Sequence, residues 1–260
     1  MWNFREEGSG RPIVLLHGIG MSHAAWRPVM PYLSATRRVI AFDIAGFGST
    51  PPLPLGTPPT VANLAERLVQ SLREMGLDEP VDLAGNSLGG AIALETAKRG
   101  LARSIVAISP AGLWRDHDTF HVKYVFGGLR FTSVHFPRIV KAIVRRAWLR
   151  ELALAVPISI GSQRMPAEDA VRAVDDLAAA TGFEATFKNT RAPFSGAGIT
   201  VPTTISFGAR DWILPRRSQH QNGLPADTRW IRPQGWGHVP MWADPEGVAR
   251  LILDGTPLHL

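Results

Sequence analysis

The stretch from Val81 to Gly90 constrains the fold more than any other part of the chain. It begins with a short apolar run of strand size and continues as G-N-S-L-G at positions 85–89, which matches the pattern G-x-S-x-G. The residues that follow, up to Lys98, favour a helix with apolar side chains along one face. A strand that turns into a helix without a loop holds the residue at the turn in a strained conformation and projects its side chain outward.

Ser87 is the residue at this turn. Gly85 and Gly89 lie two positions before and after it, where we expect a Cβ to clash across the turn. Ser87 is therefore predicted to stand at the carboxyl end of a strand, with the N–H groups of the next helix available to a developing negative charge. Alone, the pattern also fits a simple tight turn between two core elements, so its meaning depends on context.

Apolar runs of strand size alternate with helical patterns on both sides of this stretch, which indicates parallel βαβ units with ligands at the carboxyl ends of the strands. The alternation stops after Gly112 and resumes at Pro202. We therefore predict an α/β fold with a core formed by 1–112 and 199–260 and a helical cap formed by 113–198. The expected strands are 13–16, 37–43, 81–85, 104–109, 202–208 and 228–232, and the expected helices are 22–33, 60–75, 91–98, 138–155, 167–180 and 245–253.

Composition excludes several classes of site. The 260 residues include no cysteine, so the chain has no disulfide, no thiolate metal site and no cysteine nucleophile. The N-terminus lacks a basic segment followed by an apolar run, and no apolar stretch reaches the length of a membrane span, so a cytoplasmic protein is expected.

Positive charge is concentrated between Leu113 and Arg150, where eight Lys and Arg face only Asp116 and Asp118. We interpret these cations as a solvated helix face. A surface that attracts anionic substrates or a membrane is the alternative, and no motif indicates nucleic-acid binding. The cations are Arg115, Lys123, Arg130, Arg138, Lys141, Arg145, Arg146 and Arg150.

A serine hydroxyl needs a neighbouring base to react near neutral pH, and the base needs an orienting acid. Asp211 and His238 each follow a predicted strand, at the sheet edge where Ser87 is expected. Asp43 is the competing acid, although it lies in a glycine-rich turn, and Asp244 before a proline is expected to cap a helix. These positions predict a catalytic Ser87–His238–Asp211 triad.

The oxyanion of an acyl-transfer reaction would be held by main-chain N–H groups. We expect Leu88, directly after the serine, and Ile19, in the loop after the first central strand, with Gly20 second. Aromatic residues in the predicted loops and cap suggest an apolar substrate pocket, although core packing is their commoner role. The residues expected to line the pocket are His17, Gly18, Trp26, Trp212 and Val239.

Taken together, these segments resemble the capped α/β-hydrolase superfamily, in particular its bacterial esterases and meta-cleavage product hydrolases. The matching segments are H-G-I-G at 17–20, D-I-A-G-F-G-S at 43–49, G-N-S-L-G-G at 85–90, G-A-R-D at 208–211 and G-H-V-P-M-W-A-D-P at 237–245. The resemblance implies the triad named above, an acyl-enzyme, and neither metal nor other cofactor. It also implies a mostly parallel sheet flanked by helices, with the cap inserted after the sixth strand.

The leading hypothesis is hydrolysis of a carboxylic ester, thioester or lactone with an apolar acyl group. Hydrolysis of a C–C bond in a meta-cleavage product is the first alternative, with a cap arginine binding the substrate carboxylate, and perhydrolysis is a lesser one. Serine at position 87 argues against the related epoxide hydrolases, which resemble this pattern but use aspartate there. A non-catalytic ligand-binding protein on the same fold is the alternative from another class. The sequence does not indicate an oligomeric state.

Overall fold

A computed structural model describes residues 1–114, 120–156 and 158–258. Within them, a central sheet has the strand order β1-β3-β2-β4-β5-β6-β7. The first strand pairs antiparallel with β3, and every other pair is parallel, in agreement with the βαβ prediction. The strands are β1 (Phe4–Glu7), β2 (Pro12–Leu16), β3 (Arg38–Phe42), β4 (Val81–Asn86), β5 (Ala102–Ile108), β6 (Thr203–Ser206) and β7 (Arg229–Ile231).

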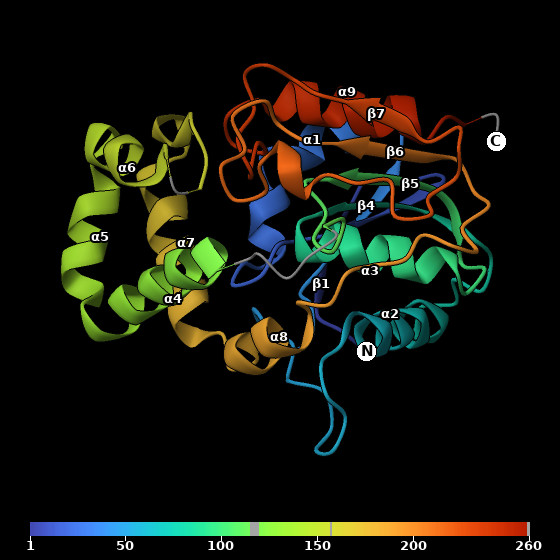
Figure 1. Ribbon diagram of the computed structural model, residues 1–260, viewed down its shortest axis with the longest axis horizontal. Coiled ribbons are helices and arrows are strands. Elements are labelled where there is room, and N and C mark those ends of the chain that lie inside the picture. Colours follow the sequence, from blue (N-terminus) through green and yellow to red (C-terminus); the bar gives the residue numbers. More distant parts are fainter. Residues whose placement is uncertain (115–119, 157, 259–260) are drawn as a thin grey trace.

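Helices cover both faces of the sheet and form the outer layers in Figure 1. On one face, α2 (Val61–Glu74) and α3 (Leu88–Ala97) pack their apolar side chains against the strands. On the other face, η1 (His23–Trp26), α1 (Met30–Ser34) and α9 (Pro245–Gly255) do the same. Both faces of β2 and β4 are therefore buried, which fits the continuous apolar run of β2, whereas β4 also buries Asp82 and Asn86.

Further helices lie between β5 and β6 in the chain and gather at one end of the molecule, away from most of the sheet (Figure 1). In the described residues they follow β5, the fifth strand, rather than a sixth. The division into core and cap stays a prediction. The helices are α4 (Phe120–His135), α5 (Pro137–Arg145), α6 (Ala147–Leu154), η2 (Ser162–Arg164), α7 (Ala167–Ala179) and α8 (Phe183–Asn189), and η3 (Arg216–Ser218) follows β6.

Two predicted helices are divided in the structure. The segment 22–33 forms η1 and then α1, because Pro28 and Pro31 remove main-chain donors from the middle of the pattern. The segment 138–155 is interrupted at Arg146, whose backbone is extended at φ −93° and ψ 115°. The break leaves the carbonyl of Val144 free of the helix, and the Arg150 guanidinium donates to it. The side chain of Asp244 caps α9 as predicted, and that of Thr60 caps α2.

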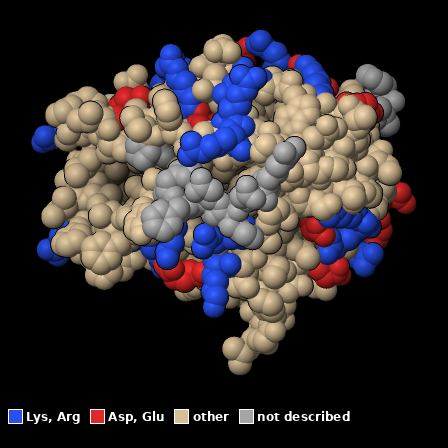
Figure 2. All heavy atoms as spheres, in the orientation of Figure 1, with Lys and Arg blue, Asp and Glu red and all other residues tan. Residues whose placement is uncertain are grey.

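The basic segment is only partly a solvated face. The side chain of Arg150 is 2% exposed, and Arg130 donates to the carbonyls of Leu177 and Ala178. On the face shown in Figure 2, Lys and Arg form separate groups rather than one continuous field. Arg115, Asp116 and Asp118 lie outside the described residues. No helix in the described part of the chain is both long and apolar enough to span a membrane.

Candidate active site

Ser87 stands between the end of β4 and the start of α3, as the sequence predicts. Its backbone has φ 53° and ψ −112°, a conformation that residues with a side chain rarely adopt. The side chain is directed away from the sheet and borders a cavity under the helices that follow β5. The strain is held by the surrounding packing, which is typical of a residue kept in place for function.

The two glycines beside Ser87 are required for different reasons. A Cβ on Gly85 would lie 2.3 Å from the main chain of Gly89, which is the clash across the turn that we expected. A Cβ on Gly89 would instead lie 2.1 Å from the carbonyl oxygen of Leu16 in the neighbouring strand. The Gly89 N–H also donates to the carbonyl of His17 at 3.0 Å. This glycine therefore fixes the turn against the loop that carries Ile19.

The structure brings the three predicted catalytic side chains into one hydrogen-bonded line. His238 Nε2 is 3.0 Å from Ser87 Oγ, and His238 Nδ1 is 3.0 and 3.2 Å from the two carboxylate oxygens of Asp211. All three residues are buried, with exposed fractions of 8% or less. The arrangement lets the imidazole take a proton from the hydroxyl while the carboxylate fixes the ring orientation.

Asp211 is held in its charged form despite its burial. Burial raises the pKa of the carboxyl group, but the neighbouring His238 and the main-chain N–H of Leu214, which donates at 2.8 Å, outweigh that effect. The pKa of Asp211 therefore lies below its ordinary value. An ionised carboxylate is the form that can stabilise an imidazolium at His238.

Residues that the sequence analysis did not single out hold the His238 loop in place. The Asn86 amide donates to the carbonyls of His238 at 2.9 Å and Ile108 at 3.2 Å. From the other side, the His238 N–H donates to the carbonyl of Ile158, and the Ser159 hydroxyl donates to the carbonyl of Val239. In the sequence, only its position next to Ser87 pointed to Asn86. Nothing in the sequence indicated that Ile158 and Ser159 contact the His238 loop.

The main-chain donors expected for an oxyanion lie on either side of Ser87. Within the described residues, no hydrogen bond occupies the N–H group of Ile19 or of Leu88. Ile19 and Ser87 line the same cavity, and Leu88 begins α3. Two unoccupied donors next to a nucleophile are what stabilisation of an acyl-transfer oxyanion requires. Their role stays a prediction.

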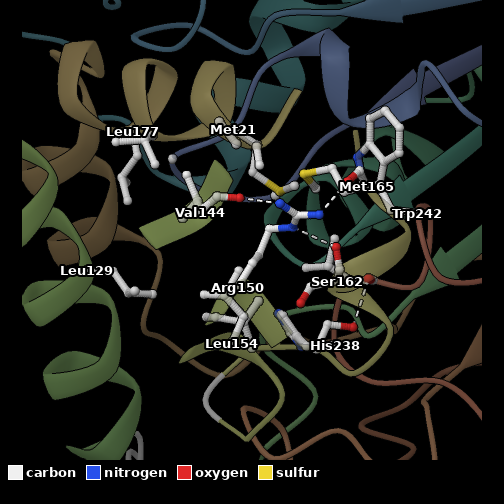
Figure 3. A pocket seen from close by; sticks show the side chains of 18 of the residues that line it. Met21, Leu129, Val144, Arg150, Leu154, Ser162, Met165, Leu177, His238 and Trp242 are labelled. Atoms are coloured by element: carbon white, nitrogen blue, oxygen red, sulfur yellow. Dashed lines mark hydrogen bonds between the residues drawn. The ribbon is translucent and has the colours of Figure 1, made fainter. Parts of the chain in front are cut away.

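A mostly apolar cavity of about 190 Å³ opens beside Ser87. Gly18 and Val239 line it as predicted, but three other expected pocket residues do not. His17 and Trp26 are completely buried in the core, and Trp212 is 61% exposed to solvent. The sequence places these residues in or near loops at the sheet edge that carries Ser87, but their side chains point into the core or into solvent and not into the cavity. Most of the lining comes instead from residues 126–177, which lie in α4 to α7 and the segments between them (Figure 3).

His17 has a structural role below the site. Its Nε2 accepts the N–H of Ile44 at 3.0 Å, and its Nδ1 lies 2.7 Å from the carbonyl of Gly18. Burial lowers the pKa of this imidazole from 6.5 to about 4. The ring is therefore neutral in the folded protein throughout the range in which an exposed histidine would charge.

This lowered pKa predicts a loss of stability in acid. Well above pH 6.5, His17 is neutral in both the folded and the unfolded state, so its titration does not affect the free energy of unfolding. As the pH falls towards 4, only the unfolded chain takes up the proton, so the free energy of unfolding decreases, by at most about 3 kcal/mol. Urea unfolding at pH 7 and 4.5 should show a decrease roughly 2 kcal/mol larger for the wild type than for His17→Gln. Equal decreases would contradict this account.

Asp43, the competing acid, belongs to a different pair. Its carboxylate accepts the ring Nδ1–H of His23 at 2.9 Å and the N–H of Ser49 at 2.9 Å. Burial raises the pKa of Asp43, but the hydrogen bonds that its carboxylate accepts lower the pKa by more, so the net shift is downward. Asp43 therefore fixes its own loop and does not orient His238. Among residues 1–114, 120–156 and 158–258, no cluster of three or more His, Asp or Glu could hold a metal ion.

The family model described as "Alpha/beta hydrolase family" matches residues 13–251, and its span includes Ser87, Asp211 and His238. The chain belongs to the alpha/beta hydrolase family. The match includes the helices between β5 and β6 and the strands β3 to β7, together with all of β2 except Pro12.

Three relatives have names of two kinds, since two are hydrolases of dienoic acids and the third is an epoxide hydrolase. The 2-hydroxy-6-oxo-2,4-heptadienoate hydrolase of Pseudomonas putida is 46% identical over 100 residues, which are 37% of this chain and only 36% of that protein. The 2-hydroxy-6-oxo-6-(2'-aminophenyl)hexa-2,4-dienoic acid hydrolase of Metapseudomonas resinovorans is 28% identical over 96% of this chain and 85% of its own. Epoxide hydrolase EphH of Mycobacterium tuberculosis is 31% identical over 74% of this chain and 92% of its own.

A solved structure shows the same alpha/beta hydrolase fold. The thermophilic esterase from Thermogutta terrifontis superposes with a TM-score of 0.69 at 20% identity, over 97% of this chain and 91% of that one. This similarity confirms the predicted fold class, including the mostly parallel sheet with flanking helices.

Proposed function

We propose that this alpha/beta hydrolase cleaves carboxylic esters through an acyl-enzyme on Ser87. The observation that carries the proposal is the line from the Ser87 hydroxyl to His238 Nε2 at 3.0 Å and from Nδ1 to Asp211 at 3.0 Å. A serine hydroxyl is a weak nucleophile near neutral pH, and this contact supplies the base that it needs. The strained backbone at residue 87 keeps the hydroxyl at the cavity.

In the proposed reaction, His238 takes the proton of Ser87 as its oxygen attacks the ester carbonyl carbon. The N–H groups of Leu88 and Ile19 bind the oxyanion, and Asp211 stabilises the imidazolium. His238 then gives the proton to the departing alkoxide, which leaves as an alcohol. Water, deprotonated by His238, attacks the acyl-enzyme and releases the acid with regeneration of Ser87.

Hydrolysis of a C–C bond in a dienoate is the second candidate, because two of the relatives carry such substrates in their names. A dienoate brings a carboxylate, which is best bound by a cation with free donors. Arg150 lines the cavity, but its guanidinium already donates to the carbonyls of Val144, Ser162, Gln163 and Met165 (Figure 3). An arginine engaged in this way cannot offer the paired donors of a carboxylate fork, which favours the ester.

Epoxide opening is a weaker candidate despite the similarity to EphH. Attack of a serine oxygen on an epoxide carbon would form an ether. An ether has no carbonyl group for His238-activated water to attack, so the enzyme would stop after one turnover. Serine at position 87 therefore favours substrates that carry a carbonyl group.

Labelling and substrate comparison test the proposal together. A fluorophosphonate probe should label the wild type, and Ser87→Ala should remove the labelling, because the probe phosphonylates an activated serine. The wild type should also hydrolyse p-nitrophenyl acetate with a larger kcat/KM than a 2-hydroxy-6-oxo-dienoate. Greater turnover of the dienoate would favour C–C hydrolysis. Folded wild type that is not labelled would favour the non-catalytic binding protein.

A further inference from the structure

We propose that two cavities divide an ester substrate at Ser87, with the alcohol part in the larger one and the acyl part in the smaller one. The preferred substrate is then an ester of a short acid and a long apolar alcohol. This inference rests on the proposed ester hydrolysis and adds its orientation and substrate class.

The two cavities meet at the nucleophile. The larger has a volume of about 190 Å³ and the smaller about 50 Å³. Ile19, Ser87 and Phe126 line both of them, so a substrate bonded to Ser87 can extend into each. The unequal volumes mean that the two halves of the substrate must differ in size.

The position of the base decides which half enters which cavity. His238 lines the larger cavity and not the smaller one, whereas Leu88 lines the smaller one. When the bond from the carbonyl carbon to the leaving oxygen breaks, the proton that His238 took from Ser87 must reach that oxygen. The leaving oxygen must therefore lie within hydrogen-bond distance of Nε2. The alcohol part then follows the wall formed by His238, and the acyl part lies on the opposite side.

The lining of the larger cavity suits a hydrocarbon chain. Leu129 of α4, Leu154 of α6 and Leu177 of α7 lie around a common space in Figure 3, with His238 among the lining side chains. Arg150 brings a charge close to this space, but four main-chain carbonyls accept its hydrogen bonds. Burial of apolar surface is therefore the main source of affinity for the alcohol part.

The smaller cavity is lined mainly by rings and branched side chains, and Thr190 and Arg191 form the polar part of its wall. Phe187 of α8 packs against Phe126 and Phe183, with ring centroids 6.3 and 6.0 Å apart. Ile213 and Leu214, which follow Asp211, form another part of the wall. At about 50 Å³, this cavity has room for a short acyl group, and a long acyl chain would extend beyond it.

Two isomeric esters test the orientation. Octyl acetate and ethyl octanoate contain the same atoms and are both esters of primary alcohols, but their long chains lie on opposite sides of the carbonyl. We expect kcat/KM to be at least about tenfold larger for octyl acetate, since a few methylenes in a pocket of the wrong size cost that much. A ratio of one or less would overturn the assignment of the two cavities.

Variants connect the preference to the two cavities. Leu154→Trp should reduce kcat/KM for octyl acetate about tenfold more than for ethyl acetate, because the indole fills the larger cavity. Leu152→Trp is the matched control on the same helix, since Leu152 is 74% exposed, and it should leave that ratio unchanged. Phe187→Ala should raise turnover of ethyl octanoate relative to octyl acetate. No change of either ratio in Leu154→Trp and Phe187→Ala would overturn the proposal.

The outcomes separate this inference from the function on which it rests. Rapid hydrolysis of ethyl octanoate with slow hydrolysis of octyl acetate would refute the orientation and leave ester hydrolysis intact. If both esters are inert while a fluorophosphonate labels Ser87, the substrate class is wrong. If both are inert and no labelling occurs, the proposed function itself fails.

Discussion

His238→Ala is expected to lower kcat/KM for an activated ester by roughly 10⁵- to 10⁶-fold, because members of a triad act as a unit. The imidazole lies 3.0 Å from the Ser87 hydroxyl and nothing else in the described residues is placed to take its proton there. Steady-state assays of p-nitrophenyl acetate hydrolysis would measure the decrease of kcat/KM, with a variant preparation free of wild-type enzyme. The residual rate should come from the oxyanion donors and from binding.

His23→Ala is the matched control for this prediction. His23 also pairs its Nδ1 with a carboxylate, that of Asp43 at 2.9 Å, but it lines neither cavity at Ser87. Turnover should stay within a few-fold of wild type in this variant. A His238→Ala enzyme that retains more than about a tenth of the wild-type rate would contradict the role of His238 as base.

The fold could be predicted because its strongest signals are local. The apolar run before Ser87 and the two glycines around it identify a strand, a turn and a helix without knowledge of the rest of the chain. Alternation of such units then implies a parallel sheet. Asp211 and His238 could be selected because each lies in the segment that comes after a strand, and the structure brings both to the Ser87 end of the sheet.

The substrate pocket could not be predicted in the same way. The position of a residue near a strand end does not give the direction of its side chain. Trp26 points into the core and Trp212 points into solvent, so neither lines the pocket. Arg150 was interpreted as solvated because charged residues on helices usually are. Its burial depends on the helix break at Arg146, beside which the carbonyl of Val144 accepts a guanidinium N–H, and on the segment 162–165, which supplies three more carbonyls. No residue near Arg150 in the sequence indicates either feature.

The largest effect on stability is expected for Asp82→Ala, at the opposite end of β4 from Ser87. Asp82 is fully buried; its carboxylate accepts the Ser104 hydroxyl at 2.7 Å and pairs with Arg37, and Arg11 Nε lies 3.1 Å away. Burial lowers the pKa of Arg37, and Asp82 opposes that shift. Removal of the carboxylate leaves the Arg37 charge buried without its counter-ion, which should reduce the free energy of unfolding by about 3 to 5 kcal/mol.

Glu6→Ala provides the comparison, because it also removes a carboxylate from an arginine. Glu6 pairs with Arg38 at 2.8 Å, but both side chains are about one third exposed, at 33% and 31%. Water can solvate Arg38 after the substitution, so the loss should be at most about 1 kcal/mol. Urea unfolding of both variants at pH 7 measures the difference. Asp82 touches neither cavity, so the folded fraction of Asp82→Ala should keep the wild-type kcat/KM. If Asp82→Ala lost no more stability than Glu6→Ala, water would have to reach Arg37, which would contradict the prediction.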